Sequence, residues 1–428
     1  MSRATERTRR SGSRTPALRY RSARRTDVES LADLGARAYR VASLEKRRSF
    51  YTEHPRFTLR DVRVGEVGGE IVASLVLYPL EAAVRGRHVP MVGVGSVAVA
   101  PEHRRRGLGE AMMRAALREM RTAGRGLSML YPFRASFYRK LGWGLCELVQ
   151  QYAFAPANLT PSDEARHVRR LRVPDRPRVQ ALYDQVAAGG HFTLARSEAW
   201  WSRRLWEYPG DWVVYAKGRG AIEGYLYYEA DPSKGPFKLA LSVSEIVAAT
   251  PEAHRGLIGH LATLRDQVEE IHLAAPARNA WPHLLRDAQN LHPGSEIGAY
   301  HDTGNLAHGA YLRLVDVKAA LEALPIATGT RGELTLEVED ALLPSNARVW
   351  RVKSDGGARL AVTPSRAAAP APAHARTSVE TLASLVSGAL PARAANHAAL
   401  LEATPAAIEL FEAWYPGGPA FLHPFNAF

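Results

Sequence analysis

The stretch SVAVAPEHRRRGLGEAMMRAALREM, residues 96–120, decides the fold. It begins inside the apolar run Val92–Val99, whose β-branched side chains are typical of a buried strand. After a turn at Pro101, apolar side chains recur every four residues from Leu108 to Met120, which predicts an amphipathic helix. The run Leu127–Leu130 then predicts a second strand. A strand, a glycine-containing turn, a helix and a strand in this order form an α/β unit.

The turn between the strand and the helix has the pattern Arg-x-x-Gly-x-Gly from Arg104 to Gly109. A helix N-terminus presents unpaired N–H groups and the positive end of the helix dipole, and glycines let a pyrophosphate approach the backbone closely. Neighbouring arginines add charge-assisted hydrogen bonds. The strand before the turn offers backbone groups to an extended, amide-bearing ligand. A pyrophosphate joined to an amide chain describes coenzyme A, and the alternative is a basic surface turn that caps an ordinary helix.

The segment from Val97 to Trp143 resembles the GCN5-related N-acetyltransferase (GNAT) superfamily. Residues 96–120 are similar to its acetyl-CoA motif, and SFYRKLGWG at 136–144 is similar to its Tyr-x-x-x-Gly-Phe signature, with Trp143 in place of the phenylalanine. From about Pro16 onward the chain resembles the enhanced intracellular survival (Eis) family. The resemblance implies an α/β and α+β fold: tandem GNAT domains, the second degenerate, followed by a sterol-carrier-protein-like α+β domain.

This organisation predicts four segments along the chain. They are a basic disordered tail at 1–16, a catalytic GNAT acetyl-CoA domain at 17–155, a degenerate GNAT-like domain at 156–303 and a sterol-carrier-like C-terminal domain at 304–428. A weak internal repeat supports the duplication, because VAPEHRRRGLG at 99–109 returns as ATPEAHRGLIG at 249–259 with two of its three arginines lost. We expect the second copy to bind no cofactor.

Hydrophobic periodicity predicts the other elements by their residue ranges. A helix over 28–42, with Asp27 as its N-cap, precedes a hairpin of 62–67 and 70–77 around Gly68 and Gly69. The pattern further predicts helices at 176–188, 379–386 and 406–414, and strands at 212–216, 225–229, 333–338 and 348–352. The Ala/Pro-rich stretch 367–375 predicts a loop. We expect Trp200, Trp201 and Trp206 in the core of the second domain, and the alternative is that they line a substrate cleft.

The family's cofactor contacts carry over to matching positions of this sequence. The resemblance implies that the pantetheine arm of acetyl-CoA lies along Val97, Ala98 and Val99. The same resemblance places two further residues near the start of the helix that leads to Tyr138, where the family commonly has a small or acidic pair: Phe133 and Arg134. The pyrophosphate would be held by Arg105, Arg106, Gly107, Leu108, Gly109 and Glu110.

Acetyl transfer to an amine requires an acid and a base. A phenol of pKa about 10 matches the departing thiolate of coenzyme A, and the family gives that acid role to the counterpart of Tyr138. The alternative for Tyr138 is a core residue beside Leu141 and Trp143, and Tyr131 is a nearby tyrosine without an assigned role. Three phenylalanines stand in the last eight residues, which is unlike a frayed terminus.

A buried chain end would bury its carboxylate, which must then be paired, hydrogen-bonded or neutralised. In the Eis family the terminal carboxylate is the proposed base, and this chain stops at the corresponding Phe428. The alternative is an aromatic plug that docks the third domain. A direct transfer is expected, because the single cysteine, Cys146, is expected to be a buried apolar residue and not a nucleophile.

The composition of the chain excludes several classes of protein. A single cysteine excludes a disulfide framework, the histidines show no metal-ligand spacing, and the longest uncharged apolar run, 89–100, is too short to span a membrane. The net charge is +13, of which +8 lies in residues 1–25, so a nucleic-acid partner is not favoured. We expect a cytoplasmic protein with no metal and, from the family alone, a homo-hexamer.

These observations lead to one preferred function and two alternatives. The preferred function is direct transfer of the acetyl group of acetyl-CoA to a primary amine of a polyamine or aminoglycoside-like substrate. Asp27 and Glu29 are candidates for acidity around that amine. The alternatives are a tandem-GNAT acyltransferase for a peptide or lysine amine, and a non-catalytic acyl-CoA-binding regulator whose basic tail binds nucleic acid.

Overall fold

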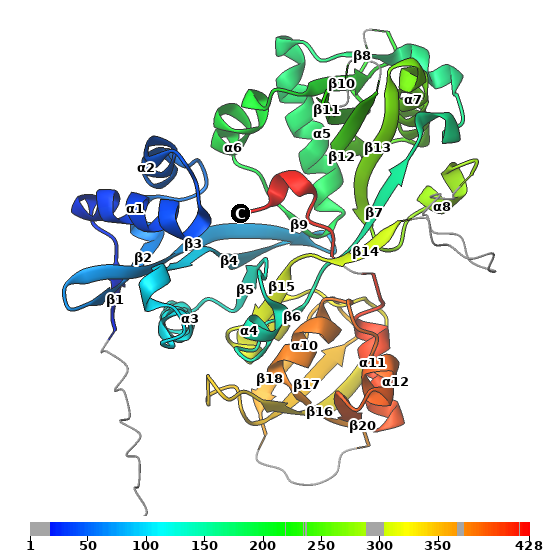
Figure 1. Cartoon of the computed structure of the whole chain (residues 1–428). Coiled ribbons are helices and arrows are strands. Elements are labelled where there is room, and N and C mark those ends of the chain that lie inside the picture. Colours follow the sequence, from blue (N-terminus) through cyan, green and yellow to red (C-terminus); the bar gives the residue numbers. More distant parts are fainter. Residues whose placement is uncertain are drawn as a thin grey trace, which may run out of the picture. The chain divides into compact units, whose positions relative to one another are not determined.

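A computed structural model describes residues 18–218, 220–233, 235, 238–287, 304–365, 372–418 and 420–428 (Figure 1). The basic tail at 1–16 lies outside the described residues. The chain divides into two compact units, Met1–Leu77 with Ser96–Ala116 and Tyr78–Gly95 with Leu117–Phe428. Strands β3 (Glu70–Val84) and β4 (Arg87–Val99) and helix α3 (Leu108–Thr122) contribute residues to both units.

The first unit confirms the hairpin. Strand β2 (Val62–Val67) pairs antiparallel with β3 across Gly68 and Gly69, whose φ angles of 61° and 89° suit the tight hairpin turn that glycines permit. Strand β1 (Arg19–Ser22) pairs with the other edge of β2. The buried cluster of this unit brings the cofactor motif onto the sheet: Leu34, Val72, Ala98, Ala100 and Leu108.

Helices α1 (Val28–Tyr39) and α2 (Leu44–Glu53) complete this unit, with α1 shorter than expected. It ends where Arg40 adopts a left-handed conformation with φ 54°. Asp27 occupies the expected N-cap position of α1, but its side chain does not cap the helix. Its carboxylate makes no cap hydrogen bond to the helix and instead accepts from the Arg24 N–H at 2.6 Å and pairs with Arg21 at 2.6 Å.

The second unit contains the other part of the first GNAT sheet. Strand β5 (Leu127–Leu130) is parallel to β4, and β15 (Tyr311–Leu314) inserts antiparallel between β5 and β6 (Gly144–Leu145). Strand β9 (His191–Leu194) pairs with the end of β3. The short helix α4 (Ala135–Arg139) follows β5.

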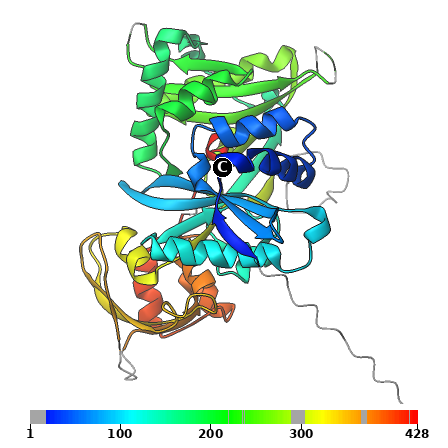
Figure 2. The ribbon, with the colours of Figure 1, turned by 90° about the vertical axis from the view of Figure 1, so that its left-hand side faces the viewer.

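The second GNAT sheet has the strand order β14-β7-β13-β12-β11-β10-β8. Helices α5 and α6 lie on one face and α7 on the other (Figures 1 and 2), so each face has its own core. The three tryptophans are buried on the α5 side, as expected. The strands are β7 (Leu148–Phe154), β8 (Val168–Arg170), β10 (Asp211–Tyr215), β11 (Gly224–Asp231), β12 (Leu239–Ala248), β13 (Val268–Pro276) and β14 (Asn305–His308); the helices are α5 (Arg176–Ala188), α6 (Glu198–Arg203), α7 (Pro251–Thr263) and α8 (Trp281–Leu284).

The third sheet has the order β18-β17-β16-β19-β20, and helices α10 and α12 pack against β16 and β19. The expected loop at 367–375 differs at its end, because His374 and Ala375 begin a strand that pairs in parallel with β16; residues 367–371 lie outside the described residues. Its elements are β16 (Arg331–Glu339), β17 (Val349–Asp355), β18 (Ala361–Pro364), β19 (His374–Ser378), β20 (Leu401–Ala403), α9 (Val317–Ala323), α10 (Val379–Val386), α11 (Ala392–His397) and α12 (Pro405–Trp414).

Both ends of the segment 304–428 differ from a self-contained third domain. At its start, β14 and β15 belong to the two GNAT sheets. At its end, the residues from Ala420 to Phe428 leave the third sheet and run along the GNAT domains. Backbone pairing with strands far away in the sequence decides to which sheet these segments belong, and such pairing leaves no signal in the local sequence. In the described residues no helix has the length and apolar character needed to cross a membrane.

Candidate active site

The last residue of the chain lies against strand β4. The Phe428 ring packs between the rings of Tyr78 and Tyr131, each with its centroid 5.5 Å away. A Cβ atom added at Gly93 would lie 2.6 Å from the Phe428 ring, and one added at Gly95 would lie 3.3 Å from the Phe428 carboxyl carbon. Glycine is therefore needed at Gly93 to admit the Phe428 ring, whereas a Cβ atom at Gly95 would first meet the Tyr78 ring, 2.8 Å away. The chain end is docked, not frayed.

Glu147 holds the start of this C-terminal tail, defined here as residues 420–428. Its carboxylate accepts hydrogen bonds from the Leu422 N–H at 2.6 Å and the Ala310 N–H at 2.9 Å. The Ala420 N–H donates to the Cys146 carbonyl at 3.3 Å. Burial raises the pKa of Glu147, and the two N–H donors oppose that shift. A buried carboxylate thus fixes where the tail enters the molecule.

The middle of the tail is anchored by an aromatic side chain. Phe425 is buried and stacks on Tyr208 and Trp212, with ring centroids 5.2 Å and 5.7 Å away. Its carbonyl accepts a hydrogen bond from the Trp200 indole at 3.2 Å. The tryptophan cluster is therefore part of the core of the second domain and also contacts the C-terminal tail.

Asn426 joins the tail to a fully buried ion pair. Its side-chain oxygen accepts from Arg196 Nε at 2.8 Å, and its amide donates to the Tyr183 hydroxyl at 2.8 Å. Arg196 pairs with Glu245 through two hydrogen bonds of 2.5 Å and 2.9 Å, and both side chains are completely buried. Burial alone would raise the pKa of Glu245, but the Arg196 guanidinium holds it below its ordinary value. The Tyr225 hydroxyl donates a third hydrogen bond to Glu245 at 2.7 Å.

Sequence reasoning missed this tail network entirely. Arg196 and Asn426 are 230 residues apart, and Glu147 and Leu422 are 275 apart. The aromatic residues of the chain end were the available signal that the tail docks. Nothing in the sequence around Glu147 marks it as the residue that receives the tail.

Tyr138 lies in α4 and is buried. Its ring meets the rings of Phe137 and Trp143 edge-on, at 5.0 Å and 6.4 Å between centroids. Its carbonyl accepts from the N–H groups of Leu141 and Trp143 at 3.0 Å and 3.2 Å. The packing against Trp143 expected of a core tyrosine is thus present, and the acid role of the hydroxyl stays a prediction.

The cofactor motif forms an exposed loop in the first unit. Arg105 and Gly107 adopt left-handed conformations with φ 60° and 78°, and α3 begins at Leu108, which is buried. The first N–H groups of a helix have no partner within the helix and stand at the positive end of its dipole, a setting that binds anions. Arg106 and Gly107 are exposed, and Glu110 pairs with Arg114 at 2.7 Å. The loop therefore fits a diphosphate.

Strand β4 leads into this loop, and we expect its backbone groups at Val97–Val99 to be available to a ligand. One of them is not. The Val97 carbonyl accepts a hydrogen bond from the Tyr39 hydroxyl at 2.9 Å, while Ala98 is buried and Val99 half-buried. Phe133 is 75% exposed and Arg134 is exposed, at the start of α4. Their contact with a cofactor stays a prediction.

The two carboxylates expected to supply acidity already have cationic partners. Asp27 is bound by Arg21, and Glu29 is bound by Arg48 at 2.7 Å. Cys146 is buried, and burial raises its pKa far above the ordinary range, so its thiol remains protonated and unreactive. Among the described residues no group of His, Cys, Asp and Glu side chains is arranged to hold a metal.

The second copy of the motif has no phosphate loop. Helix α7 begins at Pro251, and the Thr250 side chain caps it by accepting from the Ala253 N–H at 3.2 Å. Gly256 lies inside the helix, where a Cβ atom would be 2.5 Å from the Tyr215 ring. The glycine of the repeat thus serves helix packing, and the expectation that this copy binds no cofactor stays a prediction.

Comparison with known proteins agrees with this architecture. The sequence matches the family described as Acetyltransferase (GNAT) domain at 19–146 and, through a second family of the same description, at 193–305; the Sterol carrier protein domain matches at 317–423. N-acetyltransferase Eis of Mycobacterium bovis is 31% identical over 322 residues, 71% of this chain and 73% of the relative. An uncharacterised N-acetyltransferase of Streptomyces avermitilis is 31% identical over 63% of this chain and 66% of the relative.

Solved structures resemble the whole chain. Eis1 of Mycobacterium abscessus superposes with a TM-score of 0.75 at 25% identity, covering 96% of this chain and 100% of its own. A GCN5-related N-acetyltransferase from Anabaena variabilis gives a TM-score of 0.82 at 21% identity, with coverage of 96% and 100%. The likeness to the Anabaena protein shows the fold of this chain.

Proposed function

Because this chain belongs to the Eis family of GNAT N-acetyltransferases, we propose that it moves the acetyl group of acetyl-CoA directly to a primary amine of a polyamine or aminoglycoside-like substrate. The acceptor is a small molecule that carries its amine as an ammonium ion at neutral pH. The terminal carboxylate of Phe428 removes the proton from this ammonium ion, and Tyr138 protonates the departing thiolate.

One observation carries the proposal: the Phe428 carboxyl group lies beside Gly95, two residues before Val97 on the same strand. Val97, Ala98 and Val99, the positions assigned to the pantetheine arm, follow Gly95 in the sequence of strand β4. The tail network from Glu147 to Asn426 supports this role. A chain end held by so many buried contacts is pre-organised, which is what a positioned base requires.

The proton and bond changes balance with these two groups. The amine nitrogen, freed of one proton by the carboxylate, attacks the acetyl carbonyl and forms the amide bond as the thioester C–S bond breaks. The thiolate takes the phenolic proton of Tyr138, whose ordinary pKa of about 10 lies close to that of the thiol. The nitrogen loses its second proton on the way to the neutral amide and returns the phenolate to its protonated form. The products are the N-acetylated amine and coenzyme A.

The exposed loop from Arg105 to Glu110 holds the diphosphate of the cofactor in this proposal. The N-terminus of α3, which begins at Leu108, offers unpaired N–H groups, and the arginine side chains add positive charge. A homo-hexamer rests on the family alone, and sedimentation velocity tests it. A cytoplasmic location is part of this proposal, and fractionation of cells tests it.

The decisive test adds one alanine after Phe428. This change moves the terminal carboxylate away from Gly95 and replaces it with a neutral amide. Release of free thiol from acetyl-CoA, followed with a panel of primary amines, should fall to background, while calorimetric binding of coenzyme A stays within about twofold of the wild type. Unchanged turnover by the extended chain would exclude the terminal base, and a wild-type chain that acetylates none of the amines would exclude the substrate class.

A further inference from the structure

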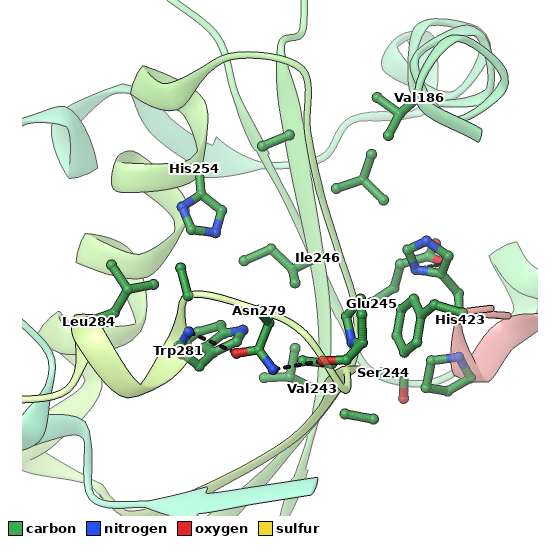
Figure 3. A pocket seen from close by; sticks show the side chains of 18 of the residues that line it. Val186, Val243, Ser244, Glu245, Ile246, His254, Asn279, Trp281, Leu284 and His423 are labelled. Atoms are coloured by element: carbon green, nitrogen blue, oxygen red, sulfur yellow. Dashed lines mark hydrogen bonds and ion pairs between the residues drawn. The ribbon is translucent and has the colours of Figure 1, made fainter. Parts of the chain in front are cut away.

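A cavity of about 540 Å³ lies in the second GNAT domain, outside the site described above. It opens between the ends of β12 and β13, with the first turn of α7 and helix α8 on one side (Figure 3). Ile246 projects into it, with His254 and Trp281 on the α7 side. The tail residues Phe421, His423 and Pro424 close the opposite side. Cavities of about 300–1,000 Å³ with mostly apolar walls are typical of small-molecule sites.

The cavity exists because two parallel strands separate. The register of β12 with β13 ends at the pair Val243 and Leu273, although β12 continues to Ala248 and β13 to Pro276. Their outer edges remain paired with β11 and β7. The inner edges of the two strand ends therefore face the cavity, and peptide groups in such a position gain free energy by hydrogen bonding to an extended ligand.

The walls select against a charged ligand. The lining residues within the described part of the chain include no Lys, Arg or Asp, and the Glu245 carboxylate is engaged by Arg196 and Tyr225. Burial lowers the pKa of His254, and it lowers the pKa of His423 to about 4, so both histidines are neutral at pH 7. The Asn279 amide donates to the Pro276 carbonyl at 2.6 Å and accepts from the Trp281 N–H at 2.8 Å, so its polar atoms are already used.

The capped N-terminus of α7 also leaves no site for a diphosphate. In the first copy of the motif an exposed loop with two left-handed residues precedes the helix, whereas in the second copy the helix begins directly at Pro251 under the Thr250 cap. The second copy thus has separated strands without a phosphate loop. What remains suits the chain of a pantetheine-like molecule without its nucleotide.

The geometry points to a second ligand site between β12 and β13, which takes a small uncharged molecule with an extended, amide-bearing chain. Its amides pair with the strand edges at Ser244–Ala248 and Ala274–Ala275, and its apolar portion packs among Ile246, Trp281 and Leu284. This site is separate from the acetyl-donor site on β4 and does not depend on the catalytic roles of Tyr138 or Phe428.

Pantetheine is the probe that tests this site, in calorimetric titrations of the full chain saturated with coenzyme A, so that the donor site on β4 is closed to it. We expect saturable binding of pantetheine with a stoichiometry near one. Replacing Ile246 with tryptophan fills the cavity and should weaken this binding by more than about tenfold. Leu239→Trp, on the same strand but outside the cavity, is the matched control and should bind as the wild type does.

Several outcomes would overturn the assignment. It fails if pantetheine does not bind the saturated wild-type chain, or if Ile246→Trp binds as tightly as Leu239→Trp. If Ile246→Trp does not fold, Ala274→Phe fills the cavity from the opposite strand and must give the same loss. 1-Octanol, an uncharged apolar probe titrated in parallel, distinguishes an apolar pocket from one that recognises amides: binding tighter than that of pantetheine overturns the amide chemistry. A failure of the catalytic proposal would leave all these titrations unchanged.

Discussion

Two glycines of β4 make room for the terminal residue. Gly93 and Gly95 have ordinary backbone conformations, so they are needed for space and not for their φ angles. A methyl group at Gly93 would sit 2.6 Å from both the Phe428 ring and the Leu80 side chain. Gly93→Ala should therefore push the Phe428 ring away from the strand, and a displacement of the base by about 1 Å should lower kcat on the order of a hundredfold.

Steady-state thiol release measures this effect, and Gly418→Ala is its control. A Cβ atom at Gly418 meets nothing within 4 Å, and the residue is close to the tail in sequence. We expect Gly418→Ala to keep the wild-type kcat. Equal rates for Gly93→Ala and Gly418→Ala would show that the position of the Phe428 ring has no bearing on turnover.

The variant Tyr138→Phe tests the acid role, because it removes only the hydroxyl group and keeps the aromatic ring. The ring of Tyr138→Phe keeps its edge-on packing with Phe137 and Trp143, so we expect thermal stability close to that of the wild type. Loss of a general acid should lower kcat by about a hundredfold, with the KM for acetyl-CoA within about twofold. Tyr131→Phe is the matched control beside Phe428. A kcat for Tyr138→Phe equal to that of Tyr131→Phe would make Tyr138 a packing residue only.

At the scale of elements, the C-terminal tail depends on a buried carboxylate at its root. Both oxygens of Glu147 accept backbone N–H groups, and a glutamine offers only one acceptor oxygen. Glu147→Gln leaves the N–H of Leu422 or of Ala310 facing an amide NH₂ group, which should cost about 1–3 kcal/mol in free energy of unfolding. Because the tail loosens, kcat should fall while coenzyme A binding changes little.

Urea unfolding and thiol release measure the two effects of Glu147→Gln. The exposed Glu402→Gln makes the same chemical change away from the tail and should be neutral in both assays. If Glu147→Gln lowers the free energy of unfolding but leaves kcat unchanged, the hydrogen bonds of Glu147 do not determine the position of Phe428.

Elements with local signals could be predicted from the sequence, and elements made by distant pairing could not. The hairpin around Gly68 and Gly69 and helix α5 are specified by glycines and by apolar spacing within a few residues. Strand β15 carries an apolar run, but only its pairing with β5 and β6 shows that it belongs to the first sheet. Likewise the repeat at 249–259 could be recognised, whereas the conversion of its glycines into helix-packing positions required the structure.

At the scale of the whole molecule, the candidate site combines both kinds of information. The cofactor motif is contiguous, so its residues could be named from the sequence alone. The residues that hold the chain end could not be named from the sequence. Arg196, Glu245 and Asn426 come together only when the second domain has folded and the tail packs against it. The aromatic chain end indicated docking but gave no partner.

Two buried histidines should make this docking sensitive to acid. His191 accepts the Phe421 N–H through its carbonyl at 3.3 Å, and its Nε2 lies 2.9 Å from the Ser387 carbonyl; His423 belongs to the tail and lies 3.5 Å from Glu245. Burial lowers the pKa of each to about 4, from an ordinary value of 6.5. Between these two pH values the unfolded chain binds more protons than the folded chain does.

The free energy of unfolding should therefore fall as the pH drops from 6.5 toward 4, with a slope of up to about two protons from this pair. Glu147 contributes with the opposite sign, because its raised pKa lets the folded chain keep a proton above pH 4.5. The double variant His191→Gln/His423→Gln isolates the histidines: its urea midpoint should lose less than that of the wild type between pH 6.5 and pH 4.5. His272→Gln, on the exposed face of β13, should follow the wild type. If the double variant and the wild type lose stability in parallel, these histidines are already protonated in the folded chain, and the tail is not held by their neutral forms.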